Sequence, residues 1–212
     1  MALDYFHAIV YDSRAVANIR KNILFRPIGY LDTQDEIYPF KKEMDGLMFQ
    51  LIKKEDGRLG IDISGSLHKY YNYVRYNKNQ NFDDFTFTLQ SEALDMLSKR
   101  IGCDLRHILI ISFEFGVNIN CGVPANDLIS KIHYFDRTKI PNREEYKNSG
   151  KQISFKADSY LIKIYNKSQE AQLFKNQGLN DVNDLIRLEF KSKDKDYTKS
   201  LGICTLEDFK NQ

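Results

Sequence analysis

The run His107–Ile119 limits the possible folds of this chain more than any other segment. It is the most strongly apolar run of the sequence, which predicts a central strand of a sheet. Glu114 and Asn118 lie in its second half at an even spacing, so both side chains face the same side of the strand. A carboxylate on such a strand is costly unless it has a cation or a metal as a partner. The segment therefore predicts a sheet with a polar site on one face.

Strand and helix patterns alternate on both sides of this run. Strands are expected at 5–11, 47–53, 59–64, 83–89, 153–155, 160–165 and 185–190, and helices at 14–21, 67–76, 91–101, 125–133 and 168–175. This order predicts an α+β fold, with a central, mostly antiparallel sheet and helices packed on one face. We expect residues 1–212 to form a single domain, with two pseudo-repeated α+β lobes, about 1–105 and 106–212, as an open alternative.

Composition excludes several classes of protein. With 42% hydrophobic and 28% charged residues, the chain is too apolar for intrinsic disorder. It has no apolar run of about 18 residues that could span a bilayer, and no signal peptide precedes the first strand, so we expect a cytoplasmic protein that does not contact membranes. The three cysteines form no C-x-x-C pair, and no two of the four histidines are close enough to be paired metal ligands.

The formal net charge of +2 conceals an uneven distribution of charge. Residues 139–175 contain eight basic and four acidic residues, whereas residues 32–62 contain five basic and eight acidic residues. The total argues against a polybasic nucleic-acid binder, but the basic stretch offers a local surface for a phosphate backbone.

The basic stretch also contains a tyrosine with unusual neighbours. In the alternating run Tyr160–Lys167, Tyr165 shares one face with Lys163 and Lys167, and a further carboxylate, Glu189, lies on the last expected strand. If these strands are neighbours, carboxylates meet a tyrosine flanked by lysines. Carboxylates suit Mg²⁺ or Mn²⁺, a tyrosine hydroxyl can attack phosphorus, and lysines can hold phosphates. In the alternative interpretation, Glu114 pairs with a buried Arg or Lys and Tyr165 is an aromatic residue at the rim.

Several segments, in order, resemble motifs of rolling-circle replication initiators, the filamentous-phage gene II-like proteins and Rep_trans plasmid initiators. Residues 63–72, Ile-Ser-Gly-Ser-Leu-His-Lys-Tyr-Tyr-Asn, are similar to their S-G-(S/N)-x-x-K-(F/Y)-x-x-x-N stretch. Residues 112–119 resemble the x-R-I-D-h-x-x-D-h strand, in which h is apolar. Residues 162–170 resemble h-R-h-Y-(D/N)-K-x-x-E, and residues 185–190 resemble h-R-h-E-h. The motifs span nearly the whole chain.

The resemblance implies a replication-initiator (Rep-like) palm that nicks and rejoins one strand of an origin through a phosphotyrosine intermediate. Its ligand is DNA, single-stranded or as an origin duplex. Carried over to this sequence, the catalytic residues are Tyr165, with Tyr160 as second choice, and Lys163 and Lys167; the Mg²⁺ or Mn²⁺ ligands are Glu114, Glu189 and Asn118; and the DNA-binding residues are Ser64, Lys69, Asn72 and Arg75.

The sequence departs from these motifs in one strand. The Arg-Ile-Asp of the family is Ser112-Phe113-Glu114 here, and Asn118 replaces the second acid. Two alternatives therefore stay open. One is a non-catalytic DNA-binding or regulatory protein of the same fold, and the other is an unrelated α+β interaction module in which Glu114, Glu189 and Tyr165 do not cluster. The oligomeric state does not follow from the sequence.

Overall fold

A nine-stranded antiparallel sheet organises the part of the chain that the structure describes. The computed structural model describes residues 2–23, 41–81, 83–135, 138–139, 142–146, 150–168 and 185–210. Within them, nine strands pair in the order β2-β3-β4-β1-β5-β11-β10-β9-β8, and every pairing is antiparallel. The strands are β1 (Ala2–Val10), β2 (Lys41–Met44), β3 (Leu47–Lys53), β4 (Leu59–Ser66), β5 (Leu109–Asn120), β8 (Asn142–Tyr146), β9 (Gly150–Lys156), β10 (Tyr160–Asn166) and β11 (Leu185–Ser192). A small ribbon joins β6 (Tyr134–Phe135) to β7 (Thr138–Lys139).

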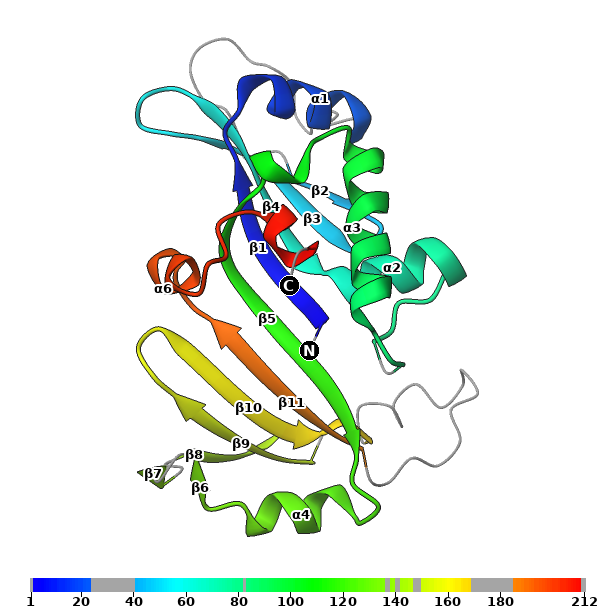
Figure 1. Cartoon of the computed structure of the whole chain (residues 1–212), viewed down its shortest axis with the longest axis vertical. Coiled ribbons are helices and arrows are strands. Elements are labelled where there is room, and N and C mark those ends of the chain that lie inside the picture. The colour runs from blue at the N-terminus through cyan, green and yellow to red at the C-terminus, as the bar shows by residue number, and fades with distance from the viewer. Residues whose placement is uncertain are drawn as a thin grey trace.

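The long strand β5 connects the two halves of the sheet (Figure 1). It pairs with β1 on one side and with β11 on the other, so the sheet continues from the N-terminal half of the chain into the C-terminal half. The helices are α1 (Ser13–Ile23), α2 (Leu67–Tyr76), α3 (Phe87–Ile101), α4 (Ala125–Lys131) and α6 (Lys195–Ser200), with short 3-10 helices η1 (Leu105–His107) and η3 (Leu206–Lys210). None of the helices described is long and apolar enough to cross a membrane.

The helices cover the apolar face of the sheet. Phe113 of β5 is 1% exposed and belongs to the same buried cluster as side chains of α1, α2, α3 and η3. A smaller cluster joins α4 to Ile153 of β9 and Ile186 of β11, which lie on the same face as Phe113 by strand register. Side chains alternate along a strand, so Glu114 and Asn118 face the opposite side. The α+β class, the antiparallel sheet and the packing of helices on one face are thereby confirmed.

Two of the expected elements around α3 are wrong. Residues 83–86 form no strand, and α3 begins at Phe87 and not after Ser91, because the Thr86 side chain caps the helix by accepting a hydrogen bond from the Leu89 amide. Gly102 ends α3 in the left-handed region at φ 66°, as expected. The helix predicted at residues 168–175 lies outside the described residues from residue 169 on.

A β-bulge in β1 positions one of the polar residues of the site. Leu3 pairs with Phe115 and Tyr5 with Glu114, so the register shifts at Asp4 and leaves that residue as the extra one. Next to the bulge, the Leu3 amide donates a hydrogen bond to Oε1 of Gln90 in α3, at 2.5 Å. The start of β1 is thus held to the helical layer while Asp4 contacts the other strands.

Candidate functional site

The open face of the sheet carries the polar residues expected from the sequence. Tyr165 of β10, Arg187 of β11 and Asn118 of β5 lie opposite one another in three neighbouring strands. One step along the same face, Lys163 of β10 lies opposite Glu189 of β11. The strand adjacency that the chemistry requires is therefore present for these five residues.

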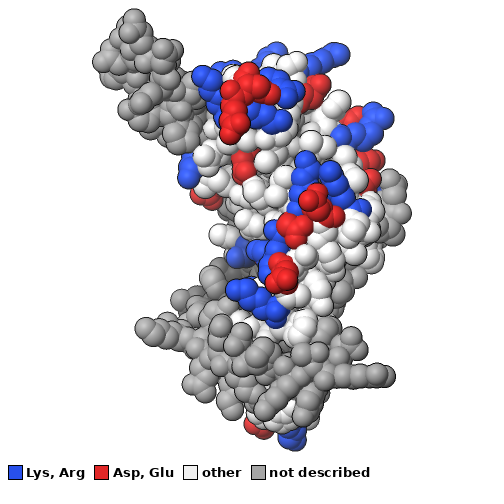
Figure 2. All heavy atoms as spheres, turned by 90° about the vertical axis from the view of Figure 1, so that its left-hand side faces the viewer, with Lys and Arg blue, Asp and Glu red and all other residues white. Residues whose placement is uncertain are grey.

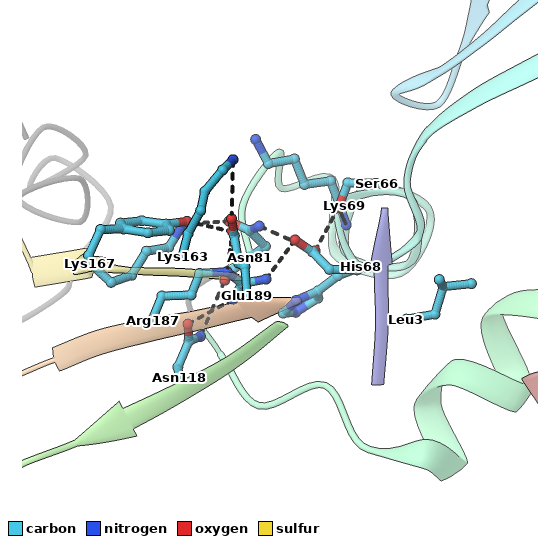
Figure 3. A network of polar contacts seen from close by, with 12 residues as sticks. Leu3, Ser66, His68, Lys69, Asn81, Asn118, Lys163, Lys167, Arg187 and Glu189 are labelled. Carbon is cyan, nitrogen blue, oxygen red and sulfur yellow. Dashed lines mark hydrogen bonds and ion pairs between the residues drawn. The ribbon is translucent and has the colours of Figure 1, made fainter. Parts of the chain in front are cut away.

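Arg187 lies at the centre of this site (Figure 3). Its Nε donates to Oε1 of Glu189 at 2.9 Å, its Nη1 to Oδ1 of Asn118 at 2.8 Å, and its Nη2 to Oδ2 of Asp4 at 2.6 Å. The Arg187 side chain is 2% exposed. It lies over Gly116, where an added Cβ would come within 2.1 Å of Nη2. Glycine at this position therefore leaves the space that the guanidinium occupies.

Tyr165 shares the Glu189 carboxylate with Arg187. The Tyr165 hydroxyl donates to Oε1 of Glu189 at 2.7 Å, and Lys163 Nζ lies 3.8 Å from Oε2 of the same carboxylate. Lys167 Nζ lies 5.9 Å from the centre of the Tyr165 ring. Lys167 is 1% exposed, whereas the Lys163 side chain is 26% exposed. Lys163 is thus the cation of this pair that a bound ligand can reach, and the buried Lys167 contributes positive potential near the Tyr165 ring.

The segment that resembles the first initiator motif lies beside the same site. Ser66, the N-cap of α2, donates through Oγ to Asp4 at 3.0 Å. Asn72 is 1% exposed and donates to Oδ1 of Asp83 at 2.8 Å, so its buried side chain holds the chain after α2. Nζ of Lys69 has no hydrogen-bond or ion-pair partner within the described part of the chain. It extends beside the network (Figure 3).

Burial and charge oppose each other at the ion pair in the middle of the site. Burial is the largest single influence on the pKa of Asp4 and would raise it, but the Arg187 guanidinium, His68 and two hydrogen bonds together outweigh it, so the pKa of Asp4 lies below its ordinary value. Hydrogen bonds from Asn81 and Ser66 act in the same direction. Burial would likewise lower the pKa of Arg187, but Asp4, Tyr165 and Glu189 together outweigh it, and the pKa of Arg187 is raised. Both groups are therefore ionised at neutral pH.

Glu114 lies on the same face but outside this network. It pairs with Lys191 of β11, whose Nζ is 2.6 Å from Oε1 of Glu114. The alternative interpretation of the sequence expects such a pair but with a buried cation, whereas the Lys191 side chain is 34% exposed. Glu189 lies opposite Gly116, two residues further along β5, so the two carboxylates are diagonal neighbours about 7–8 Å apart between Cα atoms. Glu114 and Glu189 are therefore close in space, but they differ in the side chains that they contact.

Three other predicted residues lie away from Tyr165. Tyr160 is on the helix-covered face, where it stacks on Phe190 with ring centres 5.8 Å apart, so it does not reach the network. Ser64 lies on β4 opposite His7 of β1. Arg75 is near the C-terminal end of α2 and forms an ion pair with Glu92 of α3.

Of the eight basic residues in the stretch 139–175, the structure describes the side chains of three, and these three differ in exposure. Among its described side chains, Lys156 is exposed, Lys163 is partly exposed and Lys167 is buried. The side chains from Lys139 to Lys151 and from Glu170 to Lys175 lie outside the description. On the side of the molecule shown in Figure 2, cations and carboxylates are interspersed over the described surface.

The carboxylates of this face do not fit a Mg²⁺ or Mn²⁺ site. Such an ion needs carboxylate oxygens that are free to bind it. Oε1 of Glu189 already accepts from Tyr165 and Arg187, Oε2 lies near Lys163, and Glu114 is paired with a lysine. In the ranges that the structure describes, no three His, Cys, Asp or Glu side chains are grouped to hold a metal. Arg187, Lys163 and Lys191 therefore neutralise the carboxylates that the sequence assigned to the metal ion.

Sequence reasoning missed Asp4, Asn81 and Arg187 as site residues. Asn81 Oδ1 accepts from Lys167 Nζ at 3.1 Å, and its carbonyl oxygen accepts from Asn118 Nδ2 at 3.4 Å. The sequence signal for Arg187 was available, since it alternates with Glu189 on an apolar strand. No such signal was available for Asp4, because the face to which its side chain points depends on the bulge in β1.

Comparison with known proteins adds no relative. No protein-family model, no curated protein and no solved structure matches the chain. The fold and the site therefore define the class only as an α+β protein with a tyrosine–carboxylate–arginine network on the open face of an antiparallel sheet.

Proposed function

We propose that this chain is a cytoplasmic rolling-circle replication initiator with a Rep-like palm, which nicks and rejoins one DNA strand through Tyr165. The observation that carries the proposal is the 2.7 Å hydrogen bond from the Tyr165 hydroxyl to Glu189, within a group that includes Lys163, Arg187 and Lys167. A tyrosine whose proton can pass to a carboxylate, beside cations that stabilise a phosphate, has the parts needed for transfer of a strand to the protein.

The chemistry uses residues of this chain alone. The Tyr165 oxygen attacks phosphorus, its proton moves to Glu189, and the bond between phosphorus and one strand oxygen breaks. The freed strand end leaves as an alkoxide and takes a proton from solvent. Lys163 and Lys69, which are partly exposed, hold the phosphate, while the buried Arg187 orients Glu189 through its Nε hydrogen bond. Rejoining is the reverse of this reaction, in which the strand end attacks the phosphotyrosine.

A second candidate is a non-cutting DNA-binding protein of the same fold. It is favoured by the neutralised carboxylates of the open face, which leave no oxygen-rich metal site, such as the resemblance implies, among the described residues. This candidate predicts DNA binding that weakens with salt, and no covalent product.

An adduct assay distinguishes the two candidates. The full chain is incubated with internally labelled single-stranded circles and supercoiled duplexes that contain randomised segments, in Mg²⁺, in Mn²⁺ and in a chelator. We expect a denaturant-resistant protein–DNA adduct whose peptide maps to Tyr165. Tyr165→Phe removes the adduct, and the matched control Tyr160→Phe, on the opposite face, retains it.

Other outcomes decide against the proposal. An adduct that persists in Tyr165→Phe overturns the assignment of the nucleophile. Salt-dependent binding without an adduct under any condition supports the non-cutting candidate. Absence of DNA binding at moderate salt supports the unrelated interaction module.

A further inference from the structure

A groove lies between the C-terminal parts of α2 and α3, away from Tyr165. Its volume is about 950 Å³. This is at the upper end of the range for ligand pockets in proteins, roughly 300–1,000 Å³. Asp45, in the turn between β2 and β3, also lines the groove. Nothing in the strand-transfer chemistry uses this groove.

Three tyrosines of α2 line the groove at a regular spacing. Tyr70, Tyr73 and Tyr76 are three residues apart, so they follow one another along a single side of the helix. Tyr70 is 1% exposed and forms the floor, whereas Tyr73 and Tyr76 are 42% and 59% exposed. Two aromatic rings open to solvent within one groove offer flat surfaces on which bases can stack.

The rest of the lining carries a surplus of positive charge. Arg75, Lys99 and Arg100 line the groove, and Asp45 is the one carboxylate among its lining residues. Arg100 Nε lies 3.6 Å from Asp45 Oδ2, and Arg75 pairs with Glu92 outside the lining. Lys99 is exposed and has no ion-pair partner within the part of the chain described here. The groove therefore attracts an anion, and it combines that charge with aromatic surface.

Helix α2 connects this groove to the Tyr165 site. Its first turn begins at Ser66, which contacts Asp4, and its last turn forms the groove. Lys69, Tyr73 and Tyr76 are spaced i, i+4 and i+7, so they share one stripe along the helix. A helix of ten residues is about 15 Å long. A ligand strand in the groove can therefore continue past Lys69 to the network.

We propose that the groove between α2 and α3 binds single-stranded nucleic acid. Bases stack on Tyr73 and Tyr76, and the phosphates contact Arg75, Lys99 and Arg100. The two exposed aromatic rings favour a nucleic acid as the ligand, because its bases can stack on them. An acidic peptide would contact only the basic side chains and would make no use of the rings. The proposal rests on the proposed function in taking DNA as the ligand, but it needs no chemistry at Tyr165.

Fluorescence anisotropy with a labelled 20-nucleotide oligo(dT) tests this site in the full chain. We expect Tyr73→Ala and Tyr76→Ala each to weaken binding by about tenfold, since stacking contributes about 1–3 kcal/mol per base. Lys99→Ala should reduce the slope of log affinity against log salt by about 0.7, the value for one phosphate on a single strand. Thermal melting checks that each variant is folded, as expected for exposed positions.

Matched controls lie elsewhere on the surface. Phe87→Ala removes an exposed aromatic side chain of α3 that does not line the groove, and Lys199→Ala removes an exposed cation of α6. Both should bind oligo(dT) like the parent chain. Equal binding by the parent and the Tyr73→Ala/Tyr76→Ala double variant overturns the proposal, as does absence of binding by the parent. Tighter, Tyr73-dependent binding of a labelled polyglutamate peptide also overturns it in favour of an acidic protein partner.

The adduct assay separates failure of the groove from failure of the strand-transfer proposal. If no adduct forms but the tyrosine variants lose affinity, the groove is correct and strand transfer is wrong. If an adduct forms at Tyr165 while those variants bind oligo(dT) normally, strand transfer is correct and the groove proposal is wrong.

Discussion

Glu189 and Glu114 are two carboxylates on the same face of neighbouring strands, yet their surroundings differ. Glu189 accepts hydrogen bonds from Tyr165 and from Arg187, which in turn reaches Asp4 of β1. Glu114 has one charged partner, Lys191, whose side chain is 34% exposed. A carboxylate on an apolar strand is therefore not by itself a site. Glu189 differs because it belongs to a cluster of side chains from several strands. Tyr165 and Arg187 donate to it, and Arg187 also contacts Asp4.

Replacing each carboxylate by its amide tests this difference most directly. Glu189→Gln removes the proton acceptor of Tyr165, so we expect adduct formation to slow by about 10²–10⁴-fold, the usual contribution of general acid–base catalysis. Glu114→Gln breaks only the pair with Lys191 and should leave the rate within about twofold. Single-turnover formation of the labelled adduct measures both rates. Equal losses in the two variants would show that the two carboxylates act together.

The ion pairs of Glu189 and Glu114 can also be compared by the stability that is lost when the cation of each pair is removed. Arg187→Ala leaves Asp4 and Glu189 buried without their partner, which should lower the free energy of unfolding by about 3–5 kcal/mol. Lys191→Ala breaks a partly exposed pair and should cost about 0–1 kcal/mol. Urea unfolding measures both values. A small loss for Arg187→Ala would mean that solvent reaches the two acids and that the network does not stabilise the sheet.

Gly116 tests the space beneath the guanidinium. A Cβ at this position meets Arg187 Nη2, so Gly116→Ala should displace the side chain and cost about 1–3 kcal/mol. Ser112→Ala, on the same strand and the same face, is the matched control and should change stability by about 0.5 kcal/mol or less. If Gly116→Ala is as stable as the control, the Arg187 side chain has room to move aside.

The smallest expected effect is the response of the Asp4–Arg187 pair to acid. The folded pKa of Asp4 lies below 3.8, its ordinary value, so the unfolded chain takes up this proton first as the pH falls. The stabilisation is complete above about pH 4 and is lost as the pH falls through the folded pKa. Asp4→Asn should therefore be less stable than the parent chain at pH 6, and the gap should narrow toward pH 2. A gap that stays constant over that range contradicts the ion pair.

Several parts of the fold and site followed from the sequence. The hairpin around residues 53–59, helix α2 and the strands at β5, β10 and β11 were predicted where the structure has them, because turn residues and apolar periodicity act locally. The placement of Tyr165 and Lys163 on one face also followed from strict alternation. The start of α3 was missed, because a threonine cap and packing of Gln90 against β1 outweigh the pattern at residues 83–89.

The sequence alone determined which side chains share a face, because the pleat of a strand fixes that alternation whatever its neighbours are. It did not determine which strands are adjacent, since pairing depends on contacts between distant segments. Only the tertiary structure brought Asp4 to Arg187, 183 positions away along the chain, and left Glu114 with Lys191. The chemistry of this face therefore depends on strand order and on one bulge in β1, both of which are set by packing of the whole sheet.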